Sequence, residues 1–378
     1  MIVDLPSTTT AAVSKKLVSL RANTGSMALS RVLTLVVVVE ESDAEEAIET
    51  ANDASRQHPS RIIVVVTSNR RGAARLDGQI RLGGDAGASE VVVLRLYGPL
   101  ASQGRAVVTP LLLADSPIVV WWPVEAPKNP GADPIGDMAQ RRVTNASRST
   151  GAPRTVLRKL AGAYAAGDTD LAWARITIWR GLIAAALDQP PFEKVTAATV
   201  VAAPDSPSGD LLAGWLADRL KCPVSLARSR TGTGVISIRL ERASGTVDLV
   251  RPHGSNTAIL AQPGQPDRTI ALPHRGDAEC LADELRRLDP DEVYRDALTV
   301  GLPAVNATRR TASDAVAAGL APSVPEAERT ATRLRRAASA TASVEMVEKM
   351  PMPKRSDDPG VVKKAAATKL AEVEEKSR

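Results

Sequence analysis

Residues Arg31–Glu40 read Arg-Val-Leu-Thr-Leu-Val-Val-Val-Val-Glu. Four of these residues in a row are valines, whose branched side chains favour extended strands. The run does not alternate between apolar and polar residues, and this is typical of a strand that is covered on both faces. Strands of that kind belong to parallel sheets with helices on either side. The sequence therefore predicts a buried parallel strand at this point.

The segments around this run repeat the same pattern. Helical stretches are expected over Pro6–Asn23, from the capping-box pattern Ser42-Asp-Ala-Glu45 to about Arg56, and over Leu100–Ala114. Apolar runs predict three further strands, Arg61–Thr67, Val91–Leu96 and Ile118–Trp122. Strands that alternate with helices indicate an α/β domain with a parallel sheet and right-handed crossovers.

The second half of the chain changes its pattern. One long helix is predicted over Asp168–Asp188, with Asp168 and Asp170 capping its start and Trp173 and Trp179 on its buried face. A strand at Ala197–Ala203, a helix at Leu211–Leu220 and a strand at Val224–Ala227 follow. Alternating runs then predict an antiparallel meander over Val235–Arg242, Thr246–Arg251, Thr257–Ala261 and Arg268–Leu272, before helices at Cys280–Leu288 and Asp291–Thr299.

These patterns suggest a domain plan. An N-terminal α/β domain over residues 1–155 contains the Trp-Trp-Pro segment, and a buried connecting helix spans residues 156–192. A smaller mixed α+β domain spans residues 193–303. The last segment, 304–378, is of low complexity, and we expect it to be disordered because it has few large apolar residues to bury.

Composition argues against several classes of protein. The net charge of +5 is mild, and no basic segment carries the aromatic residues used for base stacking, so we expect no nucleic-acid partner. The apolar run Val32–Val39 is too short to span a membrane. Cys222 and Cys280 do not form a disulfide framework, and this favours the reducing cytoplasm. The three histidines lack metal-ligand spacing, and no cofactor is expected.

Enzyme motifs give no positive signal. The phosphate-loop, dinucleotide-binding, nucleophile-elbow and H-E-x-x-H patterns are all missing from the sequence. The glycine-containing stretches Gly83–Gly87 and Thr231–Gly234 lead into strands rather than helices, so both are interpreted as turns. Carboxylates cluster around the Trp pair without a neighbouring histidine. The sequence thus indicates a protein that is not an enzyme.

One loop has the position of a phosphate site. Pro204–Asp210 lies between a buried strand and a helix, where open α/β sheets place their ligands. Ser206, Ser208 and the backbone of Gly209, with other N–H groups at the helix start, could hold a phosphate. Simple capping of the helix by Ser208 or Asp210 explains the same residues, and the sequence leaves both interpretations open.

The Trp pair is the main candidate for an interface. Aromatic residues make up 2% of the chain, yet Trp121 and Trp122 are adjacent and precede Pro123. Neighbouring side chains on a strand point to opposite faces, so if one indole is buried the other is directed away from that side. Core packing, a partner interface and a stacking platform for a sugar or base all remain open. The predicted partner-binding residues are Trp121, Trp122, Pro123, Arg141, Arg142 and Arg180.

The arginine pair follows a helical-looking turn, Asp137–Gln140, on a connection rich in Pro, Gly and Asn between Pro127 and Pro153. Adjacent residues on a helix project in different directions. One guanidinium is therefore expected to pair with an acidic side chain inside the domain, while the other faces a partner or a phosphate. An ordinary pair of surface charges is the alternative.

A series of motifs resembles one known family, the actinobacterial glucose-6-phosphate dehydrogenase assembly proteins (OpcA). The resemblance runs from residue 1 to about residue 303, and the chain departs from the family pattern at Asn145, where members often carry an acidic residue. The motifs are Asp-Ser-Pro-Ile before Trp121-Trp122-Pro, His58-Pro-Ser-Arg-Ile-Ile-Val, Arg141-Arg-Val-Thr, Gly167-Asp-Thr-Asp-Leu-Ala-Trp, Asp188-Gln-Pro-Pro, Leu212-Ala-Gly-Trp and Arg287-Leu-Asp-Pro.

The resemblance implies a non-catalytic activator of the oxidative pentose phosphate pathway. Such a protein would bind glucose-6-phosphate dehydrogenase in the cytoplasm and promote its active oligomer, and a homo-oligomer of the chain within the complex is a further expectation. The alternative hypothesis is a sugar-phosphate sensor or an enzyme that uses the Pro204–Asp210 loop.

Overall fold

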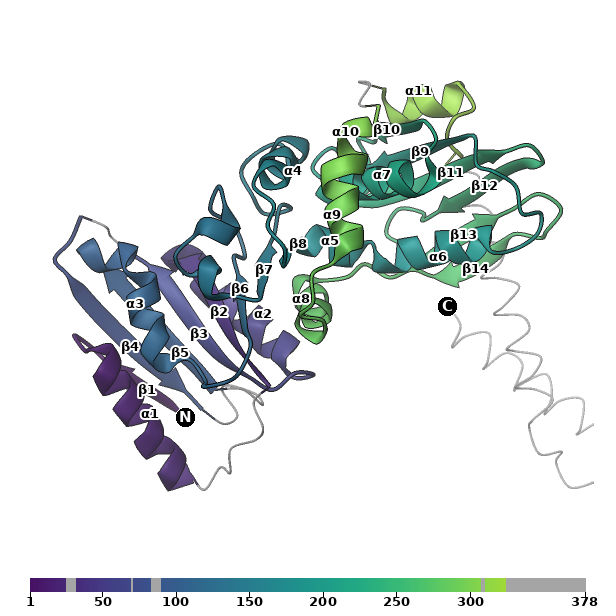
Figure 1. Ribbon diagram of the computed structural model, residues 1–378. Helices are drawn as coiled ribbons and strands as arrows, with labels where there is room; N and C mark the ends of the chain where they lie inside the picture. The colour runs from purple at the N-terminus through teal and green to yellow at the C-terminus, as the bar shows by residue number, and fades with distance from the viewer. Residues whose placement is uncertain (25–31, 69–70, 83–89, 307–309, 324–378) are drawn as a thin grey trace, which may run out of the picture. The chain divides into compact units, whose positions relative to one another are not determined.

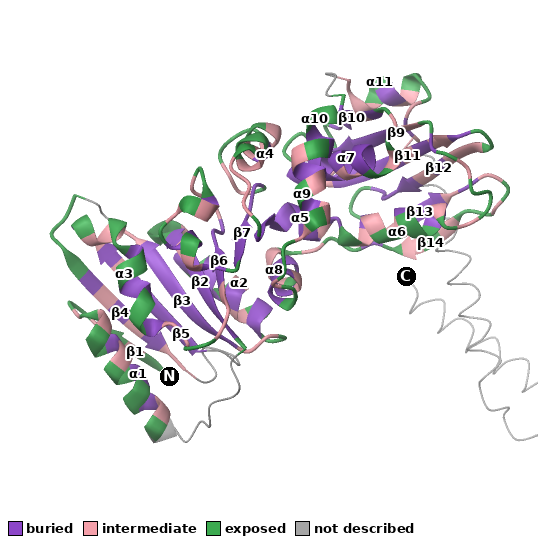
Figure 2. Cartoon of the chain, viewed as in Figure 1, coloured by how far each residue is buried: buried purple, intermediate pink, exposed green. Residues whose placement is uncertain are grey.

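The valine run forms β2 (Leu33–Glu40), an inner strand of an eight-stranded sheet (Figure 1). The structure is a computed structural model that describes residues 1–24, 32–68, 71–82, 90–306 and 310–323. β2 lies between β3 (Ser60–Thr67) and β6 (Ile118–Trp121) and is parallel to both. Central strands of this sheet are buried along most of their length (Figure 2), as the uninterrupted apolar run predicts.

The order of this first sheet is β1-β4-β5-β3-β2-β6-β7-β8. Its strands from β5 to β8 are parallel, while β4 is antiparallel to β5 and β1 is antiparallel to β4. The remaining bounds are β1 Ile2–Leu5, β4 Arg75–Arg81, β5 Glu90–Tyr97, β7 Arg141–Thr144 and β8 Asp168–Asp170.

Two apolar layers cover the faces of the first sheet. On one face, α1 (Thr10–Thr24) and α3 (Gly104–Val108) share a cluster of buried side chains with the sheet. On the other face, α2 (Ala44–Ser55) does the same together with α8 (Asp277–Arg286). The contribution of α8 is notable because it follows the meander in sequence, yet it packs against α2.

The second sheet has the order β10-β9-β11-β12-β13-β14, in which β9 and β10 are parallel and all other pairs are antiparallel. Helices α6 (Thr177–Leu187) and α7 (Pro207–Leu220) contribute to its apolar core, which includes Trp173 and Trp179. The strands are β9 Ala197–Ala202, β10 Val224–Arg228, β11 Val235–Arg242, β12 Gly245–Val250, β13 Thr257–Ala261 and β14 Arg268–Ala271.

Short helices complete the described chain. They are the α-helices α4 Pro153–Gly162, α5 Leu171–Arg175, α9 Glu292–Asp296, α10 Leu302–Ala304 and α11 Ala312–Ala317, a π-helical turn at Ala297–Gly301, and 3-10 turns at Glu41–Asp43, Gly98–Ser102, Thr109–Leu111, Pro130–Ala132 and Gly136–Met138. The α/β class and the antiparallel meander are confirmed.

Several local predictions were wrong. The connection between Pro127 and Pro153 contains β7, and the helix predicted over Asp168–Asp188 is a short strand followed by α5 and α6. Asp170 caps α5 as predicted, whereas Asp168 lies in β8 and pairs with Arg142. No capping box forms at Ser42, whose hydroxyl donates to the Asp43 carboxylate instead.

The predicted tail begins with ordered residues. Asn306 bonds to Val224 and Leu226 of β10, and Arg310 accepts a hydrogen bond from Arg228, so this segment extends the parallel edge of the second sheet. Helix α11 follows directly. Disorder is therefore the wrong expectation for Asn306 and for residues 310–323. The rest of the tail and the Gly83–Gly87 turn lie outside the described residues.

Two helical glycines give a test of the packing around α7. A Cβ atom on Gly214 would lie 2.4 Å from the carbonyl oxygen of Ala297, whereas a Cβ atom on Gly181 of α6 would meet nothing within 4 Å. We expect Gly214→Ala to lower the free energy of unfolding by about 2 kcal/mol or more, because backbone must move. Gly181→Ala should raise it by up to about 1 kcal/mol through helix propensity. Urea denaturation measures both, and equal effects would contradict this packing.

Candidate functional site

The Trp pair lies where β6 reaches the carboxyl edge of the first sheet. Trp121 is 1% exposed and Trp122 is 3% exposed. As the strand geometry predicts, the two indoles face opposite ways: Trp121 packs in the layer with α2 and α8, and Trp122 packs in the layer with α3. Pro123 is buried as well. These three residues fix the path of the chain as it leaves the sheet.

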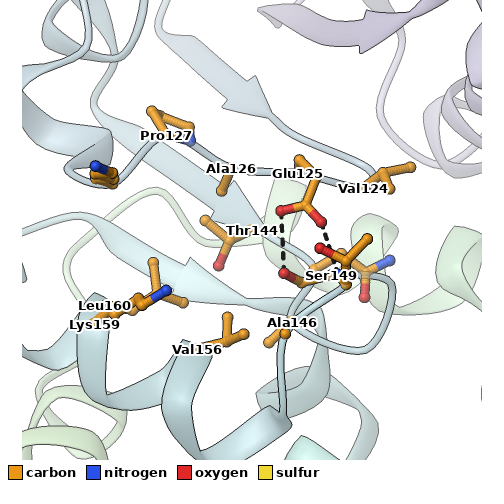
Figure 3. Close-up of a pocket in the computed structure, with 14 residues that line it drawn as sticks. Val124, Glu125, Ala126, Pro127, Thr144, Ala146, Ser149, Val156, Lys159 and Leu160 are labelled. Carbon is orange, nitrogen blue, oxygen red and sulfur yellow. Dashed lines mark hydrogen bonds between the residues drawn. The ribbon is translucent and has the colours of Figure 1, made fainter.

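The segment that follows, Val124–Pro127, separates two recesses at this edge. One has a volume of about 330 Å³ and is lined by the segment that follows β6, by the end of β7 and by α4 (Figure 3). The other, of about 320 Å³, is lined by the ends of β2 and β3 and by Trp122. Ligands of parallel sheets bind at the carboxyl ends of the strands, so this edge is a candidate binding surface.

Glu125 lies on the wall between the recesses. Its carboxylate accepts a hydrogen bond from the backbone N–H of Thr150 at 2.7 Å and from the Ser149 hydroxyl at 3.2 Å (Figure 3). The bond from Thr150 holds the pKa of Glu125 below its ordinary value. A carboxylate kept ionised in this way is a poor proton donor at neutral pH, so it acts here as a tether for the 149–150 turn.

Arg141 and Arg142 occupy β7 rather than a surface connection, and both are buried. The Arg141 guanidinium contacts Glu284 of α8, with a distance of 3.0 Å from Nε to the carboxylate, and donates to the Asp289 carbonyl. Arg142 pairs with Asp168 on the neighbouring β8 and donates to the carbonyl of Ala139. The prediction that one arginine pairs internally is confirmed, but the expectation that the other faces a partner or a phosphate is wrong, since both pair with carboxylates inside the protein. The alternative of an ordinary surface pair is wrong for the same reason.

Thr144, the last residue of β7, and Asn145, which follows it, also make polar contacts with distant carboxylates. The Thr144 hydroxyl donates to Asp170 at 2.6 Å, and the amide of Asn145 donates to Asp277 at 2.8 Å. Asp277 also pairs with Arg175. An acidic residue at position 145 would face the Asp277 carboxylate, so asparagine avoids a like-charge contact here.

Arg180 is the one predicted partner-binding residue that is not buried. Its guanidinium carbon lies 3.7 Å from the centre of the Trp173 ring, and it donates to the Thr177 hydroxyl. Partial burial lowers the pKa of Arg180 to about 10. The group thus remains protonated at neutral pH and presents a cation beside an aromatic ring.

In the predicted phosphate loop, the polar side chains form hydrogen bonds and an ion pair within the protein. Ser206 caps α7 by accepting from the N–H of Gly209, and the Ser208 hydroxyl donates to the Ala172 carbonyl. The fully buried carboxylate of Asp210 lies in the first turn of α7 and pairs with Arg228 at 2.5 Å. This internal carboxylate already supplies the negative charge that a helix N-terminus favours.

We also searched the described residues for a metal site, a reactive cysteine and a membrane-spanning helix. Within them, no group of three or more His, Cys, Asp or Glu side chains could hold a metal ion. Cys280 is fully buried, and burial raises the pKa of its thiol to about 12, far from the range of reactive cysteines. Among the helices of the described residues, none has the length and apolar character to cross a membrane.

The structure identifies a residue that the sequence reasoning missed. All nine aromatic residues of the chain are described, and Phe192 is the exposed one, at 78%. Its loop is held in place: Arg242 donates to the carbonyl of Pro191, and Ser244 donates to the Glu193 carboxylate. The available signal was its position after Pro190-Pro191, outside any apolar periodic run.

Taken together, these observations define an α/β protein of two sheets, joined by buried charged pairs and carrying recesses at one sheet edge. Residues 51–162 match the glucose-6-phosphate dehydrogenase subunit N-terminal domain, and residues 166–298 match the C-terminal domain of the same subunit. The chain therefore belongs to the OpcA family of glucose-6-phosphate dehydrogenase assembly proteins. A comparison with curated proteins gave no match.

The pair of Arg141 and Glu284 joins these two matched regions, and a double-mutant experiment can test its role. Arg141→Met should lower the free energy of unfolding by about 3–5 kcal/mol, because it leaves the Glu284 carboxylate buried without its cation. Adding Glu284→Leu should recover most of that loss. Thermal and urea denaturation give the values, and a double variant that is less stable than the single would contradict the assignment.

Proposed function

We propose that this protein is a non-catalytic assembly factor that binds glucose-6-phosphate dehydrogenase and promotes its active oligomer. The observation that carries the proposal is the match of both halves of the chain to domains of a glucose-6-phosphate dehydrogenase subunit. The engaged state of Glu125 and the buried thiol of Cys280 agree with a role that is not enzymatic. We propose that the protein acts on the dehydrogenase in the cytoplasm and so supports the oxidative pentose phosphate pathway.

The activation follows from linkage. A protein that binds one oligomeric state of an enzyme more tightly than another shifts the population toward the state it prefers. A preference of about 1.4 kcal/mol changes the ratio of the two states tenfold. No catalytic group in the assembly factor is needed for such an effect.

The Trp pair has a supporting role in this proposal. Because Trp121, Trp122 and Pro123 are buried, we propose that they position the Val124–Pro127 segment rather than touch the partner. Arg141 and Arg142 hold β7 in the same way. Arg180 and Phe192 are the candidates for direct contact, since both reach the surface.

The proposal is tested with the cognate dehydrogenase. The purified chain should co-elute with the enzyme in size-exclusion chromatography, shift its oligomeric state and raise its activity. An enzyme whose elution and activity are unchanged over a wide range of added chain would refute the proposal.

Phe192 gives the sharper test of the contact surface. Phe192→Ala should weaken binding to the dehydrogenase about tenfold or more, because exposed aromatic anchors carry much of an interface's binding energy. Val18→Ala is the matched control, since Val18 is 59% exposed on α1. Calorimetric titration measures both affinities. Equal affinities for Phe192→Ala and the unaltered chain would remove Phe192 from the interface.

A further inference from the structure

The second sheet gathers unusual polar residues at one of its ends. β9 ends at Ala202, and the start of β11 pairs with it there. β12 is antiparallel to β11, so the last residue of β12 lies at this same end of the sheet. β13 and β14 continue the antiparallel order, so the last residue of β14 lies there as well. The turn Thr231–Gly234, residues Arg251 and His253 after β12, and His274 after β14 therefore share the carboxyl end of the parallel strands β9 and β10. We call these residues the Arg251 cluster.

Arg251 differs from three other buried arginines of the protein, whereas Arg242, like Arg251, donates to a backbone carbonyl. Arg61, Arg141 and Arg142 each lie against a carboxylate. Arg251 is 6% exposed, yet its one side-chain hydrogen bond in the described residues goes to the carbonyl of Val235, at 3.0 Å. Burial lowers its pKa to about 10, with no nearby carboxylate to offset the effect. Its guanidinium carbon also lies 5.3 Å from the centre of the Trp179 ring, but neither contact supplies a negative charge, so a bound anion would stabilise this buried cation.

The neighbours of Arg251 add further donors and positive charge. A Cβ atom on Gly234 would lie 3.6 Å from Nη2 of Arg251, and one on Gly232 would lie 3.8 Å from Nδ1 of His253. His274 is exposed, and its pKa is lowered by partial burial and then by the positive charges of Arg251 and His253. Arg251 and the two histidines therefore form one electrostatic group.

The Thr231–Gly234 turn presents its backbone to this group. Gly232 and Gly234 have φ values of 84° and 66°, which glycine adopts without steric cost. In the described part of the chain, the N–H groups of Gly232, Thr233 and Gly234 meet no hydrogen-bond acceptor. Successive free N–H groups in such turns form anion-binding concavities.

We propose that the Arg251 cluster binds the phosphate group of a small molecule. Phosphate fits better than carboxylate, because the guanidinium, the two imidazoles and the free N–H groups of the turn together offer more donors than the two oxygens of a carboxylate can accept. In the neighbouring Pro204–Asp210 loop, the Asp210 carboxylate already pairs with Arg228, whereas no carboxylate pairs with Arg251 in the described residues. This inference is independent of the partner proposed above.

The three histidines of the chain provide an internal readout. Inorganic phosphate, titrated into the full chain at constant ionic strength, should shift the side-chain NMR signals of His253 and His274 in a saturable way. The signal of His58, which follows α2 at the first sheet, should stay in place. Acetate should shift the first two signals much less than phosphate. Absent shifts, or equal shifts of all three signals, would overturn the proposal.

Substitutions test whether phosphate binding depends on Arg251. Arg251→Met should weaken phosphate binding about tenfold or more, since it removes a charge-assisted fork of donors. His274→Gln changes an exposed residue and should weaken binding severalfold, which covers the case in which the buried substitution impairs folding. Arg268→Met removes a cation at the start of β14 and is the matched control. Unchanged phosphate affinity in a folded Arg251→Met chain, or in His274→Gln, would contradict the assignment.

Discussion

Two guanidinium groups buried next to each other on β7 are the constraint on which the arrangement of this protein depends. A charge removed from water is tolerated when it is paired and hydrogen-bonded. Because adjacent strand residues face opposite ways, Arg141 and Arg142 need carboxylates on two different elements, α8 and β8. Both partners come from the C-terminal matched region, so the same two residues join the N-terminal region to it.

Three aromatic residues differ in burial: two tryptophans pack inside the first sheet's layers, and one phenylalanine is exposed. Trp121 and Trp122 fill the layers on opposite faces of the first sheet and thereby set the start of the Val124–Pro127 segment. Phe192 is held on a tethered loop with its ring in solvent. In a chain with so few aromatic residues, an exposed ring on a fixed loop is a better candidate for a partner contact than a buried indole pair.

Much of the fold could be predicted from local patterns, and the failures have physical causes. The uninterrupted valines of β2 and the alternation in β11 to β14 were correctly interpreted, because burial on both faces or on one face leaves a direct trace in sequence. β7 and β8 were missed since they are short and polar. Their charged residues are stable inside the protein through partners far along the chain, and no window of local sequence contains those partners.

The sequence by itself determined the α/β class, the family and the opposed directions of the Trp pair, because side-chain periodicity and motif order are local properties. The tertiary structure alone decided which side chains are accessible. It buried both indoles and both arginines, left Phe192 exposed, and brought Arg251, His253 and His274 to one end of a sheet. Accessibility and clustering depend on strand register and on contacts between distant segments, which composition and spacing do not specify.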